Sequence, residues 1–440
     1  MQYLPNILFL VALAAGIGYF TKNIRKVIRN IKLGKPVDIS DHKGERMGNV
    51  FRIALGQSKM VVRPVAGFLH IIVYVGFIII NIEVLEIIID GIFGTHRIFS
   101  SLGVVYNLLI GTFEILALLV LVGVIIFWTR RNVQKIKRFW SKEMTGWPKK
   151  DGNFILYFEM VLMVLFLTMN AADLQLQNLG AAHYTVAGSF PVSQYIAPLF
   201  SGLSEATLII IERSAWWIHI LGILVFLNYL YFSKHLHIML AFPNVYFGKL
   251  TPKGQFKNNE AVTAEVKMMM DPNVDPFAAP PEGAEAPAKF GASDVIDLTQ
   301  TQLLNAYTCT ECGRCTSECP ANQTGKKLSP RKIMMDTRDR LEEIGKNIDK
   351  NGSFKPDGKQ LLDDYITREE LWACTTCNAC VEACPVSIDP LSIIMDMRQY
   401  LVMEQSAAPN ELNVTMTNIE NNGAPWPFNQ MDRLNWKNEA

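Results

Sequence analysis

The chain begins with long apolar runs and ends with a polar region. Five apolar runs lie before residue 243, at about residues 3–20, 65–89, 101–128, 154–171 and 207–233. A helix of about 20 apolar residues crosses the hydrocarbon core of a bilayer. The first run lacks a preceding basic segment and a small-residue cleavage site, so we expect a retained helix rather than a signal peptide. The pattern predicts five transmembrane helices within residues 1–243.

Lysine and arginine are distributed unevenly among the connections between these runs. The connections after the first and third runs are rich in both residues, whereas the others offer only Arg97 and Arg213. Basic loops of membrane proteins stay on the cytoplasmic side. We therefore expect a multi-pass protein of the inner (cytoplasmic) membrane, with its N-terminus outside and its polar C-terminal region in the cytoplasm.

Composition divides the rest of the chain into three segments. Residues 244–293 are rich in proline and alanine and predict a linker with little regular structure. Residues 294–405 predict a globular domain. Residues 406–440 predict an extended tail, whose aromatic side chains either pack on this domain or dock a partner.

Helix caps recur in the globular segment, and strand signals are scarce. Caps are predicted at Ser329 before a proline, at Thr367 with Glu370, and at Asp389 before a proline. The predicted fold class is therefore all-α, with a five-helix transmembrane bundle followed by a cytoplasmic α-helical domain.

All eight cysteines fall in two copies of one spacing, C-x2-C-x2-C-x3-C-P. This run binds a pair of [4Fe–4S] clusters, with three thiolates on one cluster and the fourth on the other. The predicted first set is Cys309, Cys312, Cys315 and Cys384, and the predicted second set is Cys374, Cys377, Cys380 and Cys319.

Two other roles of these cysteines, structural zinc binding and disulfide formation, are less well supported. Structural zinc usually binds two separated pairs of ligands rather than four closely spaced thiols. Disulfides are rare in the reducing cytoplasm, where we expect this domain to lie. The spacing therefore favours a protein that carries electrons.

Three histidines lie in or at the ends of the predicted membrane helices, where ionisable side chains are usually functional. Haem b needs two axial nitrogens from facing helices. A spacing of eighteen residues places His219 and His237 on one face of the fifth helix, about 27 Å apart, and turns His235 away from that face. We expect the remaining histidines, which lie in loops, to be ordinary polar residues.

The expected depth of each histidine in the membrane indicates which two would bind a haem. His70 lies near the cytoplasmic end of the second helix, so we expect it to pair with His237 in binding one haem b. A second haem would use His219, but the facing position holds Ile80, which cannot ligate iron.

Three acids, Glu83, Glu114 and Glu159, also lie in the predicted membrane helices. Each could bond to a neighbouring helix or face a small wet cavity. Alternatively, they could deliver the two protons that reduction of a quinone consumes.

Two segments of the chain resemble known families. The cysteine domain, including L-S-P-R-K at 328–332, resembles the helical ferredoxin of the small iron–sulfur subunit of heterodisulfide reductase. Residues 67–77 and 218–238 resemble the cytochrome b gamma subunit of respiratory nitrate reductase, with the family's haem histidines at His70, His219 and His237. The resemblance covers about residues 1–240 and 294–400.

The resemblance implies a function and partners. Similar membrane-bound proteins link electron-transfer flavoprotein, or another cytoplasmic flavoprotein, to menaquinone. Those proteins carry a further domain with cysteine-rich CCG motifs, and no cysteine follows Cys384 here. We therefore expect a CCG-domain iron–sulfur subunit to dock in trans, and electrons to pass between the cytoplasmic partner and menaquinone through the clusters and haem b.

Other functions fit parts of the pattern. The chain could be the iron–sulfur and cytochrome subunit of a glycolate- or lactate-type dehydrogenase or of a disulfide reductase, or a membrane-tethered redox sensor or scaffold. The sequence has no G-x-G-x-x-G loop and no P-loop, so we do not expect it to turn over an organic substrate alone. A net charge of +1 gives no indication of nucleic acid binding.

Overall fold

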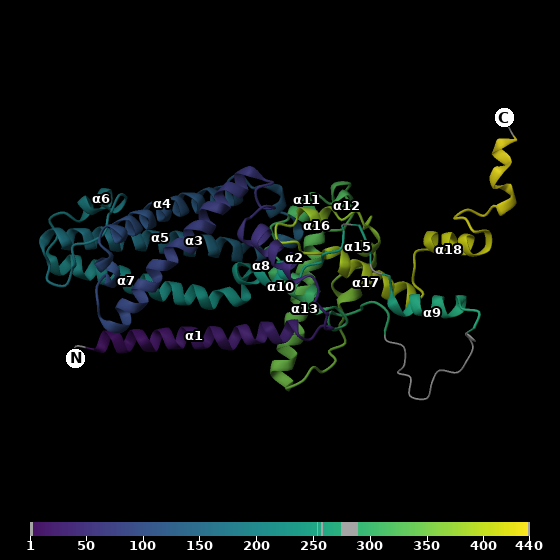
Figure 1. Ribbon diagram of the computed structural model, residues 1–440, viewed down its shortest axis with the longest axis horizontal. Coiled ribbons are helices and arrows are strands. Elements are labelled where there is room, and N and C mark those ends of the chain that lie inside the picture. The colour runs from purple at the N-terminus through teal and green to yellow at the C-terminus, as the bar shows by residue number, and fades with distance from the viewer. Residues whose placement is uncertain (1–2, 253, 257, 274–288, 439–440) are drawn as a thin grey trace.

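The computed structural model of the chain describes residues 3–252, 254–256, 258–273 and 289–438. The molecule is elongated, with long helices side by side at one end and a domain of shorter helices beyond them (Figure 1). Apart from isolated bridges, the described residues form no β-structure. The all-α prediction is confirmed.

Five helices are long and apolar enough to cross a membrane. They are α1 (Leu4–Ile31), α3 (Pro64–Phe93), α4 (Val104–Asn132), α5 (Trp147–Leu179) and α7 (Glu205–Tyr229). Each covers most or all of one predicted apolar run, and several continue into the flanking polar residues. The five predicted helices are confirmed.

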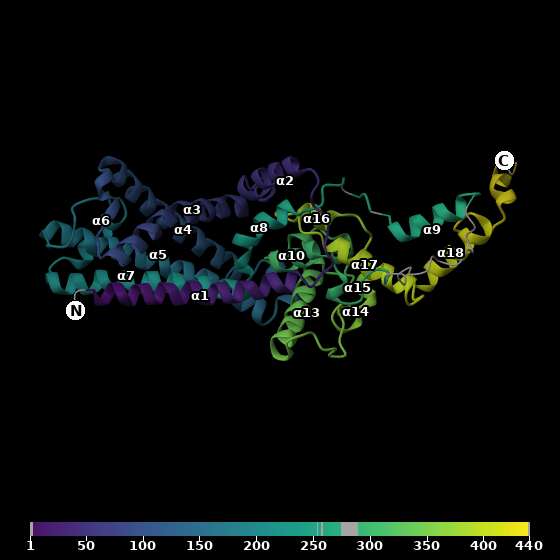
Figure 2. The ribbon, with the colours of Figure 1, turned by 60° about the horizontal axis from the view of Figure 1, so that its bottom comes forward.

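Four of these helices form a bundle, and α1 lies along its side next to α3 and α7 (Figure 2). Small residues allow close approach at the crossings. A Cβ atom on Gly76 would lie 2.5 Å from the Val120 side chain, and one on Gly222 would lie 2.9 Å from the Leu162 side chain. A larger residue at either position would displace the facing side chain.

Short elements connect the membrane helices and follow the last of them. They are α2 (Lys43–Asn49), η1 (Val50–Leu55), η2 (Ile98–Leu102), η3 (Lys137–Phe139), η4 (Lys142–Met144), α6 (Ser193–Ile196), η5 (Ala197–Phe200), η6 (Leu230–Phe232), η7 (Lys234–Leu236) and α8 (His237–Tyr246).

The fifth apolar run does not continue as one helix to His237. Ser233 is extended (φ −103°, ψ 149°) between two short 3-10 turns, and its hydroxyl donates to Asp151 at 2.7 Å. The expectation that His219 and His237 share one helix face is therefore wrong. His235 was expected to point away, yet its ring lies 5.4 Å from that of His237.

The domain after the membrane bundle is built from short helices around one longer helix, α13. Its elements are η8 (Val295–Asp297), α10 (Gln300–Thr308), α11 (Arg314–Ser317), α12 (Pro320–Gln323), α13 (Pro330–Asn351), α14 (Leu361–Asp364), α15 (Arg368–Trp372), α16 (Ala379–Ala383) and α17 (Pro390–Met403). The predicted caps at Ser329, Thr367 and Asp389 are confirmed, because each side chain accepts a hydrogen bond from the first turn.

This domain packs directly on the ends of the membrane helices. Val27 of α1, Leu230 and Leu236 belong to the same buried core as the domain's apolar side chains. The Asn30 side chain donates to the Tyr307 hydroxyl at 2.9 Å across the junction. Packing, rather than the linker, therefore positions the domain.

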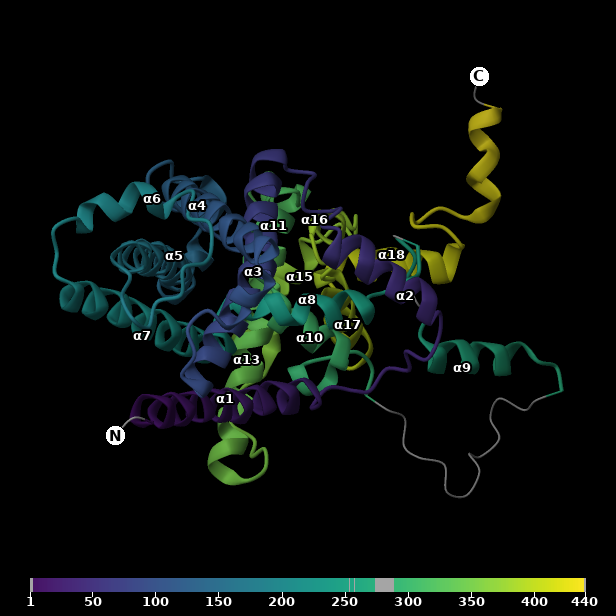
Figure 3. The ribbon, with the colours of Figure 1, turned by 60° about the vertical axis from the view of Figure 1, so that its left-hand side comes forward.

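Two segments contain more helix than predicted. The expected irregular linker holds α9 (Glu260–Met270), which begins at an Asn259 cap and consists of good helix formers; residues 274–288 of this linker lie outside the described part. The expected extended tail holds α18 (Asn410–Asn422) and η9 (Gln430–Lys437). Both segments project from the body, and no side chain in these three helices is buried (Figure 3).

Arg340 supports a test of this fold. Its side chain is fully buried and pairs with Asp294 at 2.8 Å and Asp357 at 2.6 Å. Arg340→Met should lower the free energy of unfolding by about 3–5 kcal/mol, because it leaves carboxylates without their partner. Melting of the full chain in detergent, followed by circular dichroism, measures this. Arg368→Met removes an exposed pair with Asp363 and should cost less than about 1 kcal/mol; equal effects would contradict the prediction.

Candidate functional site

The two cysteine motifs fold into matching turns. Glu311 (φ 56°) and Gly313 (φ 72°) flank the second cysteine of one motif, and Thr376 (φ 57°) and Asn378 (φ 59°) flank that of the other. A left-handed backbone is uncommon outside glycine and asparagine. Its repetition at equivalent positions shows that both loops take one specific path.

Thiols from both motifs come together in two crossed sets. In the first set, the Cys315 thiol lies close enough to interact electrostatically with the thiols of Cys309, Cys312 and Cys384. In the second set, Cys374 lies within reach of Cys319, Cys377 and Cys380. Cys315 is also within reach of Cys380, so the two sets are neighbours. The structure thus groups the thiols as the spacing predicts, and their role as ligands stays a prediction.

The chemistry of these thiols fits iron–sulfur clusters. Burial raises the pKa of Cys309 and Cys380 to about 12 and that of Cys384 to about 11, and neighbouring thiolates add repulsion. Buried thiolates held this closely need a positively charged group between them, which iron supplies. A bound [4Fe–4S] cluster acts as a one-electron carrier. In the described part of the chain, no three ligating side chains are placed to hold a single metal ion.

Charged side chains fix the first motif against the membrane bundle. The buried Lys234 ammonium pairs with Glu311, which also pairs with Arg338 at 2.8 Å. Arg314 donates to the main-chain carbonyl of Met60 at 3.3 Å. The first set of thiols therefore lies over the end of the bundle.

The fold brings His70 and His237 together at this end. His70, on α3, lies within electrostatic reach of His237 and of Arg314. Nδ1 of His237 lies 3.1 Å from the Lys234 carbonyl and must donate to it, which leaves Nε2 free to bind a metal. Nδ1 of His70 is buried with no partner. Binding of a haem b between these two side chains stays a prediction.

His235 belongs to the same cluster and was missed by the sequence analysis. It lies within electrostatic reach of both His70 and His237, and its Nε2 is 3.7 Å from a Glu159 oxygen. Helical periodicity misplaced it because the helix breaks at Ser233. A serine between apolar and basic residues was the available signal, since serine is a common helix cap.

His219 lies deeper in the bundle, away from this cluster. Its side chain is 2% exposed, and Nδ1 lies 3.0 Å from the Leu162 carbonyl. This bond satisfies a buried imidazole and would equally orient a metal ligand. Its predicted part in a second haem stays a prediction.

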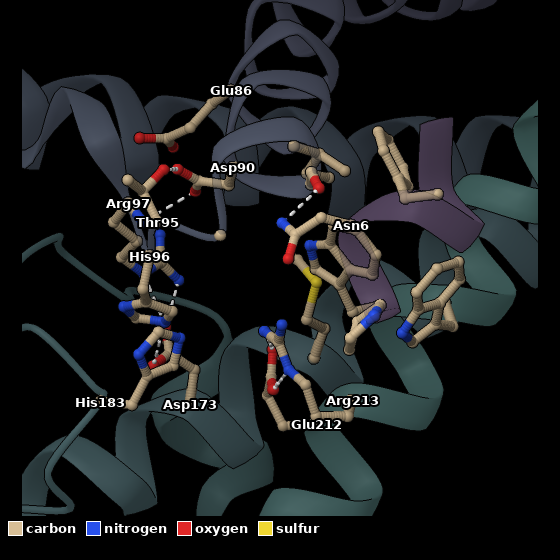
Figure 4. A pocket seen from close by; sticks show the side chains of 18 of the residues that line it. Asn6, Glu86, Asp90, Thr95, His96, Arg97, Asp173, His183, Glu212 and Arg213 are labelled. Atoms are coloured by element: carbon tan, nitrogen blue, oxygen red, sulfur yellow. Dashed lines mark hydrogen bonds and ion pairs between the residues drawn. The ribbon is translucent and has the colours of Figure 1, made fainter. Parts of the chain in front are cut away.

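The other end of the bundle holds a polar cavity of about 420 Å³. Arg97 pairs there with Asp173 at 2.5 Å, beside His96 and His183, while Glu212 and Arg213 lie across the opening (Figure 4). The two histidines were expected to be ordinary loop residues, yet both line this cavity. Only the fold brings these loops together.

Two of the three intramembrane acids, Glu114 and Glu83, have different surroundings. Glu114 is fully buried and accepts hydrogen bonds from Asn170 at 3.2 Å and from the Val192 and Ser193 N–H groups. Glu83 lines the polar cavity, and one of its oxygens has no partner. Glu114 therefore bonds neighbouring segments, whereas Glu83 faces a cavity.

The raised thiol pKa values predict an order of alkylation in the iron-free chain. Iodoacetamide reacts with thiolates. Cys309 and Cys380 should remain almost unlabelled at pH 8 and react faster as the pH approaches about 12, because thiolate forms only near the raised pKa. The exposed Cys377 should be labelled first. Mass spectrometry of the labelled peptides measures the order, and uniform labelling at pH 8 would contradict it.

Comparison with known proteins supports the assignment of the cysteine domain. Residues 308–388 match the family described as a 4Fe-4S dicluster domain. The chain is 30% identical over 99% of its length to a probable iron-sulfur-binding oxidoreductase, FadF, of Bacillus subtilis, and covers 61% of that protein. No solved structure matches the chain.

Further relatives extend the comparison. An EtfAB:quinone oxidoreductase of Syntrophomonas wolfei is 27% identical over 91% of this chain, which covers 55% of that protein. A probable membrane-anchored ferredoxin of Chromohalobacter salexigens is 34% identical over 34% of the chain and 25% of that protein. The chain thus spans about 55–61% of the length of the two relatives that match most of it. It contains a dicluster 4Fe-4S domain and is similar to iron–sulfur oxidoreductases.

Proposed function

We propose that this chain is a membrane-anchored electron-transfer protein that connects a cytoplasmic redox partner with menaquinone through two [4Fe–4S] clusters and haem b. The observation that carries the proposal is the junction between the domains. Arg314 lies within electrostatic reach of Cys312 and Cys384 of the first set and also of His70. Thiols suited to clusters and histidines suited to haem thus meet at one junction.

The position of the histidines explains how the protein would pass electrons into the bilayer. His70 is the seventh residue of a membrane-spanning helix, and His237 follows the break after another. A group held by both would lie between the cysteine domain and the apolar region where a quinone dissolves. The protein supplies spacing and orientation, and the cofactors supply the electron chemistry.

The distribution of basic residues supports the proposed orientation of the protein in the membrane. The basic connections after α1 and α4 lie at the same end of the bundle as the cysteine domain (Figure 1). Under the positive-inside rule this end is cytoplasmic, and the polar cavity faces outward. The partner that exchanges electrons with the clusters is therefore a cytoplasmic protein.

The relatives suggest the class of partner. One relative is named an EtfAB:quinone oxidoreductase, which supports electron-transfer flavoprotein as the donor and a quinone as the acceptor. Two electrons leave the reduced flavin and, with two protons, convert the quinone to quinol. We propose a CCG-domain iron–sulfur subunit, bound in trans, as a further cytoplasmic partner. The dehydrogenase and disulfide reductase alternatives would bind a different cytoplasmic partner. The sensor or scaffold alternative would not carry electrons to a quinone.

Cofactor content is the first test of the proposal. The full chain purified in detergent should contain about eight irons in clusters and about one haem b. A dithionite-reduced minus air-oxidised visible spectrum, with iron and haem quantified on the same sample, measures both. Eight irons without haem would exclude the cytochrome part and leave a membrane-anchored ferredoxin.

Histidine variants test whether electrons pass through a haem held by His70 and His237. His70→Ala and His237→Ala should each abolish haem binding and slow quinone reduction at least tenfold, while cluster iron stays unchanged. His235→Ala is the matched control: it removes an imidazole from the same cluster, but one whose Nε2 faces Glu159, so haem should be retained. Haem content and quinone reduction by the reduced flavoprotein are measured on the same preparations. Unchanged electron flow in both ligand variants would favour a sensor or scaffold.

A further inference from the structure

The two cysteine motifs share one backbone path but differ in the side chains beside their second cysteine. Glu311 in the first motif corresponds to Thr376 in the second, with φ values of 56° and 57°. Arg314 corresponds to Ala379, which likewise begins a short helix. The first motif therefore carries two charged residues where the second carries neutral, smaller ones.

The charged residues of the first motif are used in contacts with the membrane bundle. Glu311 pairs with the buried Lys234, and Arg314 donates to main-chain carbonyls before α3. The next connection also lies against this loop, because a Cβ atom on Gly313 would lie 3.3 Å from the Arg138 side chain. The first set of thiols is thus covered by the bundle.

The second motif makes a different surface. Cys377 is the exposed member of the eight cysteines, and Thr375 beside it is also exposed. A shallow hollow of about 240 Å³ lies over this thiol, lined by Gly254, Thr376, Cys377, Asn378, Ala379 and Glu382. Small side chains at the rim allow another protein to approach the thiol closely.

We infer that the surface around Cys377 is the electron-entry port, where a soluble flavoprotein docks with its flavin facing the second set of thiols. This inference rests on the proposed function and adds the order in which an electron passes the two sets. Each electron that the reduced partner loses enters at the Cys377 end, passes to the first set, and leaves toward His70. The adjacency of Cys315 and Cys380 provides the passage between the sets.

The chemistry of the rim indicates how the partner binds. Thr376, Asn378 and Ala379 of the lining are uncharged, as is the exposed Thr375 two residues before Cys377, and Glu382 is the acid of the lining. Docking on such a surface depends on shape and close approach more than on opposite charge. Electron entry should therefore change only slightly between low and physiological salt.

The first experiment asks which set faces water. The full chain with both clusters, in detergent, is reduced and mixed with a soluble dysprosium chelate, and the electron spin relaxation of each cluster is measured. Cys377→Ser and Cys312→Ser identify the two signals. The second set should relax several-fold faster with the chelate and the first set should not change. Faster relaxation of the first set, or equal changes in both, would overturn the inference.

The second experiment asks whether a protein donor uses this surface. Reduced electron-transfer flavoprotein is the probe, and stopped-flow absorbance follows cluster reduction. Thr375→Trp should slow reduction by the flavoprotein at least tenfold and leave reduction by dithionite unchanged, because bulk at the rim excludes only a large donor. Lys355→Trp, at an exposed position on the loop after α13, is the matched control and should react like the unmodified chain.

The outcomes separate the inference from the proposed function. Normal reduction of Thr375→Trp by the flavoprotein would overturn the port and leave the proposed function intact. If the flavoprotein reduced neither set in the unmodified chain, the proposed donor would be wrong. The chelate measurement would then still decide whether the second set is the exposed one.

Discussion

The buried contact between Lys234 and Glu311 determines how the two halves of the molecule meet. Lys234 follows the break after α7, its main-chain N–H donates to Asp151 of α5 at 3.0 Å, and its ammonium reaches Glu311 in the first cysteine motif. One residue therefore joins two membrane helices to the loop that holds the first set. Removing either charge would leave the other buried without a partner, which is costly.

The early end of the fifth membrane helix makes this contact possible. A continuous helix would carry His235 and His237 around its axis and place the following residues on different faces. The break at Ser233 instead turns the chain along the end of the bundle, where both histidines approach His70 and Lys234 reaches the cysteine domain. The same local break thus shapes the histidine cluster and the domain junction.

The bundle has distinct ends. Toward the cysteine domain, histidines and basic loops surround the first set. At the opposite end, buried acids and two arginines line the polar cavity, where Arg97 bonds Asp173, Asn170 and Tyr106. Burial of so many charged groups requires partners within the protein, and ion pairs supply them for Arg97 with Asp173 and for Arg213 with Glu212. The proposed electron path uses only the first of these ends.

Several features followed directly from the order of residues. The five membrane helices were predictable because each must satisfy its own backbone hydrogen bonds in an apolar stretch. The caps at Ser329, Thr367 and Asp389 were predictable because a cap depends on residues within one turn. The helices α9 and α18 were missed because a polar, proline-containing composition describes a whole segment and hides short runs of good helix formers.

The sequence by itself determined the five membrane helices, the helix caps of the cysteine domain and the spacing of the cysteine motifs, because hydrophobic runs, caps and ligand spacing act over neighbouring residues. Only the tertiary structure decided that His235 joins His70 and His237, that Arg97 and Asp173 meet at a cavity, and that the first motif is covered while Cys377 stays exposed. These features depend on contacts between segments far apart in the chain and on one break at Ser233. Local propensity carries no information about where such segments meet.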